Sequence, residues 1–374
     1  MSAEAGWDVV VIGAGIIGAA CAWRLAERGL RVRVLERDHP AGGSSGKSAA
    51  GVRAQFTSDT NILLSKHSIG EYARMPASGY RPAGYLMLVP ERQWGVHLAG
   101  VERQHVHGVP TEVLTPAQAQ RHAPFETGGL GGCTFCPTDG VVDPHELTFE
   151  YVRLAREAGV RFSLGTPVTA VSRRGGRWRV TTPAGAVEGE QVLNTAGAWS
   201  GEVAALAGLD VPVRPARRMV FTTGPLSLPH RLPMVFDLES GVWLRSEGER
   251  LILGRADEAD VGWREGMDWA WLEPTLERAL ERFPWLETAS LDRRASWWGY
   301  YEITPDHQPV VGRMPGVEGW LNACGFSGHG VMQAAATARV IAQEACFEVP
   351  FVDIAPLRYE RFAGGVQPAH DIQV

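Results

Sequence analysis

The stretch that decides the fold runs from Asp8 to Asp38 and reads DVVVIGAGIIGAACAWRLAERGLRVRVLERD. Its opening run, Asp8 to Ile12, is rich in β-branched residues, as is typical of a strand buried on both faces of a parallel sheet. An alanine-rich segment with apolar residues at helical spacing follows and ends at Gly29, a usual place for a helix-terminating glycine. Residues 31–35 predict a second strand. The stretch is therefore expected to fold as strand, turn, helix and strand.

Three glycines occupy the expected turn between the first strand and the helix. Gly13, Gly15 and Gly18 have the spacing G-x-G-x-x-G, which lets backbone N–H groups and the helix N-terminus approach a pyrophosphate. Glu36 closes the second strand, where its carboxylate can accept hydrogen bonds from ribose hydroxyls, and it disfavours a 2′-phosphate. The unit predicts a site for FAD or NAD rather than NADP, with the expected contacts Gly13, Gly15, Ile16, Ile17, Gly18, Glu36 and Arg37.

The segment after Asp38 favours FAD over NAD. An NAD dehydrogenase would continue with regular βαβ repeats, whereas this chain continues with HPAGGSSGKSAAGVRAQF. These small and polar residues suit an extended stretch that runs beside a pyrophosphate and a ribityl chain. The expected cofactor contacts in this segment are Ser44, Ser45, Lys47, Ala49, Ala50 and Gly51.

Two further turns are expected to meet the same cofactor. In GEQVLNTAGAWSGEVAALAG, residues 189–208, a strand ends at Asn194 and a turn leads into a helix. In NACGFSGHGVMQ, residues 322–333, a short strand leads through SGHG to an alanine-rich helix, whose N-terminus could stabilise the negative edge of a reduced flavin. The expected contacts in these two turns are Thr195, Ala196, Gly197, Trp199, Gly325, Phe326, Gly328, His329, Gly330, Val331 and Met332. Val168, which lies outside both stretches, is a further expected contact.

Composition and charge limit the class of protein. The 374 residues are 45% hydrophobic and 21% charged, as in a globular chain with one large or two interleaved domains. The formal net charge of −6 argues against a nucleic-acid surface. The apolar N-terminal run is interrupted by glycines and lacks a cationic leader, so neither a signal peptide nor a membrane span is expected there or elsewhere. A small-molecule partner is expected instead.

The cysteines indicate a reducing compartment. Five cysteines are few, odd in number and scattered, which argues against a disulfide framework and favours the cytoplasm. The pair Cys133 and Cys136 in CTFC lacks a second Cys or His pair at zinc spacing. We therefore assign no metal.

A series of motifs along the chain resembles one family of flavoproteins. They are VVVIGAGIIGAACAWRLAERG, VLERD, GGSSGKSAAGVRAQF, DGVVDPHELT, NTAGAWS, VWLRSEGERLILG, GYYEITPDHQPVVG and ACGFSGHGVM, which span nearly the whole chain in this order. The combination is similar to the FAD-dependent amine and amino-acid oxidoreductases typified by D-amino-acid oxidase, glycine oxidase, sarcosine oxidase and its β subunit, dimethylglycine dehydrogenase and the L-proline dehydrogenase β subunit. The combination is specific to the family and less so to a member.

The resemblance implies an α/β fold of mixed α+β type, with a Rossmann-type FAD-binding domain assembled from discontinuous segments and a mixed-sheet substrate domain. The expected FAD-binding segments are residues 1–84, 140–214 and 302–374, and the expected substrate-binding segments are residues 85–139 and 215–301. The residues support a sheet in the second part, because GVWLRSEGERLILG reads as a hairpin. Its expected strands are residues 242–245 and 251–254, with a polar turn between them.

Two departures from the sarcosine oxidases bear on the chemistry. In the members that attach flavin through a cysteine, the resemblance places that cysteine five residues before the threonine of TPD. Counting back from Thr304 gives Gly299, and no histidine in the first glycine-rich stretch offers the other common attachment, so non-covalent FAD beside Gly299 is expected. A lysine that helps to hold the substrate carboxylate is replaced by Met332. That replacement favours proline-like, dimethylglycine-like or bulkier, less polar substrates.

Four more residues are candidates for contact with the substrate or for catalysis. The resemblance places an arginine after the glycine-rich stretch, here Arg53, whose donor fork could bind a carboxylate bidentately or pair with a structural acid. Arg245 on the hairpin is a second candidate anchor. Tyr301 lies just before TPD and could line the apolar side of a pocket. His329 is expected to pack against the flavin or fix the turn, with proton transfer as the alternative.

The expected function is FAD-dependent oxidation of a C–N bond in a small amino acid or N-alkyl amino acid. A hydride would pass to flavin N5 and the resulting imine would hydrolyse. Two alternatives stay open: an electron-transferring dehydrogenase subunit that works with an acceptor protein or partner subunit, and a deaminating D-amino-acid or glycine oxidase. A macromolecule-linked substrate such as tRNA is disfavoured by the acidic net charge.

Overall fold

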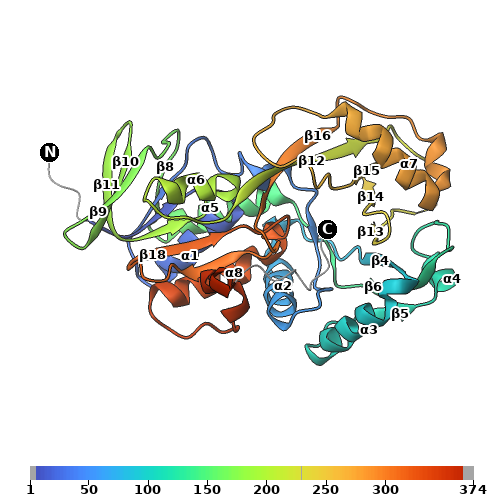
Figure 1. Ribbon diagram of the computed structural model, residues 1–374, viewed down its shortest axis with the longest axis horizontal. Helices are drawn as coiled ribbons and strands as arrows, with labels where there is room; N and C mark the ends of the chain where they lie inside the picture. Colours follow the sequence, from blue (N-terminus) through green and yellow to red (C-terminus); the bar gives the residue numbers. More distant parts are fainter. Residues whose placement is uncertain (1–5, 229, 365–374) are drawn as a thin grey trace.

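The computed structural model describes residues 6–228 and 230–364 and shows two large sheets at opposite ends of an elongated molecule (Figure 1). Residues 1–5 and 365–374, which belong to the expected FAD-binding segments, lie outside the described residues, as does residue 229 of the expected substrate-binding segments. Each sheet has eight strands, and each draws on segments that are far apart in the chain.

The first sheet has β1 near its centre. Its main order is β17-β18-β11-β1-β2-β8, and β10 and β9 continue from β11. β1 is parallel to both β2 and β11, and its residues Val9, Val10 and Val11 are completely buried, as expected for a central strand with both faces covered. The strands are β1 (Trp7–Ile12), β2 (Val32–Leu35), β8 (Arg161–Ser163), β9 (Ala170–Arg174), β10 (Arg177–Thr182), β11 (Gly185–Asn194), β17 (Val310–Arg313) and β18 (Trp320–Cys324).

Helices gather around this sheet (Figure 1). Helix α1 (Ile16–Glu27) packs between α5 (Pro144–Glu157) and α8 (Gly330–Ala345). Helix α8 also packs against α2 (Asp59–Tyr72). Their small and apolar residues form one buried cluster with the central strands. The helices are α1 (Ile16–Glu27), α2 (Asp59–Tyr72), α5 (Pro144–Glu157), α6 (Ser200–Ala205) and α8 (Gly330–Ala345).

The second sheet has the order β16-β12-β15-β14-β13-β4-β6-β5, with an apolar core of its own beside α3, α4 and α7 (Figure 1). Its strands are mostly antiparallel, but β13 and β4 are parallel. The elements are β4 (Tyr85–Pro90), α3 (Glu91–Val106), β5 (Glu112–Leu114), α4 (Pro116–Ala119), β6 (Leu130–Cys136), β12 (Arg214–Thr222), β13 (Met234–Asp237), β14 (Trp243–Glu247), β15 (Arg250–Gly254), α7 (Leu272–Arg282) and β16 (Trp297–Ile303).

Several shorter elements lie outside the two large sheets. β3 (Gly51–Val52) and β7 (Gly140–Val141) form a two-stranded ladder. The short 3-10 turns are η1 (Ser44–Lys47), η2 (Pro76–Ser78), η3 (Gly197–Trp199), η4 (Trp269–Trp271), η5 (Pro284–Thr288), η6 (Ala355–Leu357) and η7 (Tyr359–Gly364).

The expected fold class is confirmed, and two local expectations need correction. The hairpin exists, but β14 and β15 extend into the expected polar turn, which shrinks to Gly248 and Glu249 because Glu247 pairs with Arg250. Gly248 has a φ of +62°, a value that glycine adopts without strain in such a tight turn. The stretch after Asp38 was expected to be extended, but it contains the 3-10 turn η1, which the Ser48 N–H closes by donating to the Ser45 carbonyl.

None of the helices in the described part of the chain combines the length and the apolar character that a bilayer crossing needs.

Candidate active site

A groove lies where β1, β2 and β11 end, the edge at which parallel sheets of this kind bind ligands. We call it the strand-end pocket. It gathers residues from the glycine turn, the end of β2, η1, the loop before β9 and the turn after β11. The predicted cofactor contacts that line it are Gly13, Gly15, Ile16, Ile17, Glu36, Arg37, Ser44, Ser45, Val168, Thr195, Ala196, Gly197 and Trp199.

The glycine turn requires glycine at two positions. Gly13 has a φ of +106°, and a Cβ there would lie 2.5 Å from the carbonyl oxygen of Thr195. A Cβ on Gly18 would overlap the carbonyl oxygen of Gly13 and lie 2.7 Å from Thr195 Oγ1. The two glycines therefore allow α1, β1 and the turn after β11 to approach one another, which leaves the α1 N-terminus at the pocket wall.

Charged residues at the end of β2 line the strand-end pocket. Glu36 Oε2 accepts a hydrogen bond from the Ala14 N–H at 2.7 Å, and Oε1 accepts one from the Asp38 N–H at 2.8 Å. Arg37 pairs with Asp38 through Nε at 3.0 Å, and its guanidinium lies 4.2 Å from the ring centroid of Trp199. Glu36 is thus fixed beside the glycine turn, as a ribose-binding carboxylate requires.

Serines of η1 supply hydroxyl groups between the groove and a second pocket. Ser45 Oγ accepts a hydrogen bond from the Ile16 N–H at 3.0 Å. Ser44 Oγ is buried and has no hydrogen-bond partner within the described residues, although it lines both pockets. A buried hydroxyl without a partner is costly unless a ligand meets it. Together with the glycine cradle and Glu36, this donor set fits the ribose and pyrophosphate of FAD.

The second pocket lies between the two sheets, and we call it the inter-sheet pocket. Residues from β12 and β16 form one wall, and the turn before α8 forms another. Five residues line both pockets, so the two are continuous: Ile16, Ile17, Ser44, Ser45 and Glu302. The other predicted residues that line the inter-sheet pocket are Lys47, Ala49, Ala50, Gly51, Gly299, Tyr301, Gly328, His329, Gly330, Val331 and Met332.

The turn before α8 is packed tightly against β16. Gly328 has a φ of +95°, and a Cβ there would lie 2.5 Å from the Tyr301 ring. His329 precedes α8, is 4% exposed, and makes an edge contact with Phe56 at 5.2 Å between ring centroids. The glycine-rich turn is therefore a close-packed surface, and the α8 N-terminus faces the pocket.

Five predicted residues do not line either pocket. Gly18, Gly325 and Phe326 lie behind the walls and shape them. Arg53 is completely buried, with its guanidinium 4.1 Å from the Phe56 ring centroid and Nη2 at 3.4 Å from His329 Nε2. Arg245 donates to the Ala49 carbonyl at 3.0 Å and pairs with Glu247. The anchor roles of both arginines stay predictions.

Several lining residues were missed from the sequence, notably Arg218, Arg255 and Glu302. Arg218 directly precedes the apolar run MVF in RPARRMVFTT, and Arg255 directly follows the apolar strand LILG. A charge at such a place is the signal that could have singled out either residue. Glu302 belongs to the GYYEITPD motif, but nothing local in that motif indicates where its carboxyl group lies.

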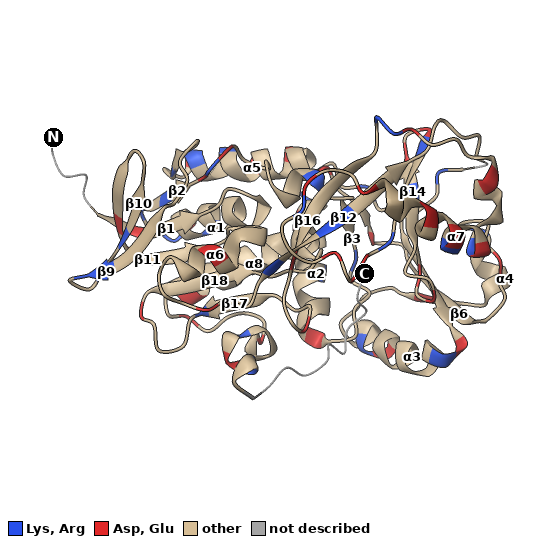
Figure 2. Ribbon diagram, turned by 45° about the horizontal axis from the view of Figure 1, so that its top comes forward, with Lys and Arg blue, Asp and Glu red and all other residues tan. Residues whose placement is uncertain are grey.

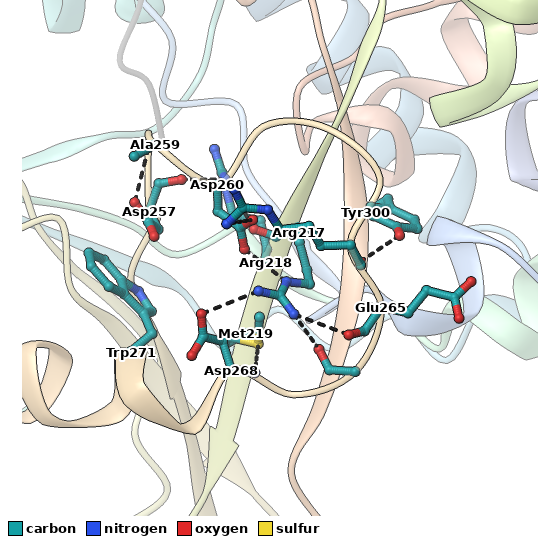
Figure 3. Close-up of polar contacts among 12 residues, drawn as sticks. Arg217, Arg218, Met219, Asp257, Ala259, Asp260, Glu265, Asp268, Trp271 and Tyr300 are labelled. Carbon is teal, nitrogen blue, oxygen red and sulfur yellow. Dashed lines mark hydrogen bonds and ion pairs between the residues drawn. The ribbon is translucent and has the colours of Figure 1, made fainter.

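The two adjacent arginines of β12 have different surroundings (Figure 3). Arg217 pairs with Asp260 at 2.8 Å and Asp268 at 3.2 Å and donates to the carbonyl of Gly266, so it fastens the loop after β15. Arg218 donates to the Arg217 and Asp257 carbonyls. Both arginines therefore contact the loop after β15, but successive side chains of a strand point to opposite faces, and only Arg218 of the two lines the inter-sheet pocket.

Glu302 lies at the junction of the two pockets. Its Oε2 accepts a hydrogen bond from the Gly325 N–H at 2.9 Å, and the residue is half-buried and lines both pockets. Burial raises the pKa of Glu302 to about 7, because desolvation disfavours the charged form more than the backbone donors favour it. The group therefore titrates near neutral pH, as groups at functional sites often do.

The described chain contains no candidate metal site. No three His, Cys, Asp or Glu residues come together there as a metal would require. Cys133 and Cys136 are buried in β6, where desolvation raises the pKa of each thiol to about 12. Figure 2 shows acidic and basic residues intermixed on α7 rather than gathered by sign.

Comparisons with known proteins agree with this geometry. Residues 8–344 match the model of the DAO family, described as FAD dependent oxidoreductase. The chain is 30% identical to FAD-dependent oxidoreductase domain-containing protein 1 of Bos taurus, over 96% of this chain and 85% of that protein. It is 28% identical to mitochondrial dimethylglycine dehydrogenase of Rattus norvegicus, over 95% of this chain but only 45% of that longer protein.

A solved structure has the same architecture. L-proline dehydrogenase from P. horikoshii superposes with a TM-score of 0.89 at 27% identity, covering 97% of this chain and 99% of that one. The matched family is FAD-dependent, and most of the predicted cofactor contacts line the two continuous pockets. The chain therefore belongs to the DAO family of FAD-dependent oxidoreductases.

Proposed function

We propose that the protein oxidises a carbon–nitrogen single bond in a small amino acid or N-alkyl amino acid. The observation that most directly supports this function is that the two pockets are continuous. They share the lining residues Ile16, Ile17, Ser44, Ser45 and Glu302. A dinucleotide held at the strand ends can extend its ring system into the inter-sheet pocket, where a substrate can lie beside it. The similarity to proteins named for dimethylglycine and L-proline supports a secondary or tertiary amino acid.

The protein residues orient the reactants and shield them from water. FAD, when bound, would supply a two-electron oxidant for the C–H bond next to the substrate nitrogen. The backbone of Gly328 to Met332 and the α8 N-terminus favour negative charge at their side of the pocket. The β12 and β16 wall holds the substrate on the other side and excludes water. The imine product hydrolyses to an aldehyde or ketone and an amine, and no dedicated acid–base pair is proposed.

We also propose that residues 1–84, 140–214 and 302–374 bind FAD and that residues 85–139 and 215–301 bind the substrate. The membership of the two sheets supports this division, since the first sheet uses β1, β11 and β18 and the second uses β4, β12 and β15. Cytoplasmic localisation and an acceptor protein or partner subunit stay predictions. All five cysteines are free thiols, which supports a reducing compartment.

The test of the function is product formation under turnover. The FAD-loaded protein, incubated with N-alkyl amino acids and an artificial electron acceptor, should release an aldehyde or keto acid in equal amount to the reduced acceptor. Replacing the acceptor with air separates the alternatives, because an oxidase yields hydrogen peroxide and a dehydrogenase does not. Turnover of primary D-amino acids or glycine alone would favour the deaminating oxidase instead.

The flavin should be bound without a covalent link. Gly299 lines the inter-sheet pocket, and the described lining residues of both pockets include no cysteine. Acid precipitation of the holoprotein should therefore leave the flavin in the supernatant. Flavin in the pellet would contradict this expectation, and its loss from the pellet of a His329→Ala variant would identify His329 as the attachment.

A further inference from the structure

The inter-sheet pocket holds more positive charge than a single carboxylate needs. Its charged lining residues are Lys47, Arg218, Arg255 and Glu302, three cations and one carboxyl group. Burial raises the pKa of that carboxyl group to about 7, so near neutral pH it offsets at most part of one cation. A pocket of this composition favours a ligand with more than one negative charge.

Arg218 is buried with its charge weakly compensated. It is 9% exposed, and its Nε has no hydrogen-bond partner within the described residues. Its acidic neighbour Glu258 is 3.6 Å away, and the Glu258 side chain is 69% exposed, so that contact contributes little. The guanidinium also lies 5.4 Å from the Tyr301 ring centroid, on the side of the pocket. A buried guanidinium with a free donor edge is suited to a carboxylate.

Arg255 is a second cation on the same wall. It directly follows β15, which pairs with β12, and it is partly exposed. Its Nε donates to the Ser240 carbonyl at 3.0 Å, and its guanidinium lies 5.1 Å from the Trp271 ring centroid. Within the part of the chain that the structure describes, it forms no ion pair. These contacts orient the guanidinium group and leave its charge without an acidic partner among the described residues.

We propose that the substrate is an amino acid with a second carboxylate. Arg218, the more buried cation, binds the α-carboxylate, and Arg255 binds the second carboxylate nearer the mouth. Lys47, whose Nζ is 4.3 Å from the Trp298 ring centroid, adds to the positive potential of the pocket. This inference rests on the proposed amino-acid oxidation and narrows its substrate class. Met332 lines the same pocket, and in this proposal the cations Arg218 and Arg255 take the place of the lysine that the sarcosine oxidases have there.

The test compares matched pairs in which a terminal methyl group replaces the second carboxylate. N-(2-carboxyethyl)glycine is paired with N-propylglycine, and N-methylglutamate with N-methylnorvaline. For at least one pair, kcat/KM for flavin reduction should be about tenfold or more higher for the diacid, as a charged hydrogen bond provides. The diacid that is preferred shows whether the second carboxylate lies on the nitrogen substituent or on the side chain.

Variants separate the two anchors. Arg255→Met should abolish the preference by lowering kcat/KM for the diacid to about the value for its monoacid partner, whereas Arg218→Met should weaken both members of each pair. Arg218→Lys, which keeps the charge and loses the fork, provides the same comparison if the methionine variant folds poorly. Arg293→Met is the matched control, because Arg293 lies on Trp269 outside the pocket lining. An Arg255→Met variant that keeps the preference would overturn the proposal.

A binding measurement distinguishes failure of this inference from failure of the proposed function. Thioether analogues, with sulfur in place of the amine, cannot be oxidised at a C–N bond but keep the carboxylates. Calorimetry with the holoprotein should show 3-(carboxymethylthio)propanoate binding at least about tenfold tighter than (propylthio)acetate. Equal affinities, together with equal kcat/KM values within both amino-acid pairs, would overturn the inference. Tight diacid binding without flavin reduction by any of the four amino acids would overturn the proposed oxidation instead.

Discussion

Gly18→Ala should leave the protein unable to hold FAD. The added Cβ would overlap the Gly13 carbonyl oxygen and lie 2.7 Å from Thr195 Oγ1. Both neighbours belong to the turns that line the strand-end pocket, so α1 must move away from β1 and take its N-terminus with it. We expect a loss of about 3 kcal/mol in unfolding free energy and at least about a 100-fold loss of FAD affinity, measured by denaturant unfolding and by titration of the apoprotein.

Gly95→Ala is the matched control for that substitution. Gly95 is exposed in the interior of α3, and an added Cβ there would meet nothing within 4 Å. Alanine should stabilise the protein by about 0.5–1 kcal/mol, because it restricts the unfolded chain and favours a helix. FAD affinity should not change. A Gly18→Ala variant that binds FAD as tightly as the Gly95→Ala variant would contradict the assigned role of the turn.

Glu302→Gln should remove a pH dependence of stability. The folded pKa of Glu302 is about 7 against an ordinary value of 4.5. Between these two pH values the folded state keeps a proton that the unfolded state releases, so stability falls as pH rises. Glutamine, which stays neutral, should therefore stabilise the protein at pH 8 by up to about 3 kcal/mol relative to the wild type and have little effect at pH 4.5.

Two comparisons isolate the contribution of Glu302. Burial also raises the pKa of Asp139 to about 6, so the Glu302→Gln variant should keep the part of the wild-type pH dependence that comes from Asp139. Glu287→Gln, at an exposed position, should be as stable as the wild type at both pH values. Substrate binding supplies a second readout, since KM for an anionic substrate should rise above pH 7 in the wild type and stay flatter in the variant. Parallel stability curves for wild type and Glu302→Gln would contradict the assignment.

The sequence predicts those parts of the site that local patterns specify. The spacing of Gly13, Gly15 and Gly18 and the acid at Glu36 lie within one strand-turn-helix-strand unit, and their geometry follows from that unit alone. The turn before α8 was found in the same way. The hairpin was also predicted, but its turn is shorter than expected because register depends on the pairing of Glu247 with Arg250.

The substrate side of the site depends on contacts between distant segments. Arg218 reaches the pocket because β12 pairs with β16, which places Gly299 opposite it. Arg53 looks equally suitable in the sequence, but it is buried behind His329, a residue 276 positions away. The shifted pKa of Glu302 arises from burial that no neighbouring residue reveals. The positions of these residues in the site follow from the chain topology and not from local sequence patterns.

The most direct test is anaerobic mixing of the FAD-loaded protein with an excess of each matched amino acid while the visible flavin absorption is followed. The structure predicts that at least one dicarboxylic amino acid bleaches the flavin at a rate that saturates with substrate concentration, and that Arg218→Met slows or abolishes the bleaching. A protein that binds FAD but is bleached by none of these amino acids would contradict the proposed oxidation.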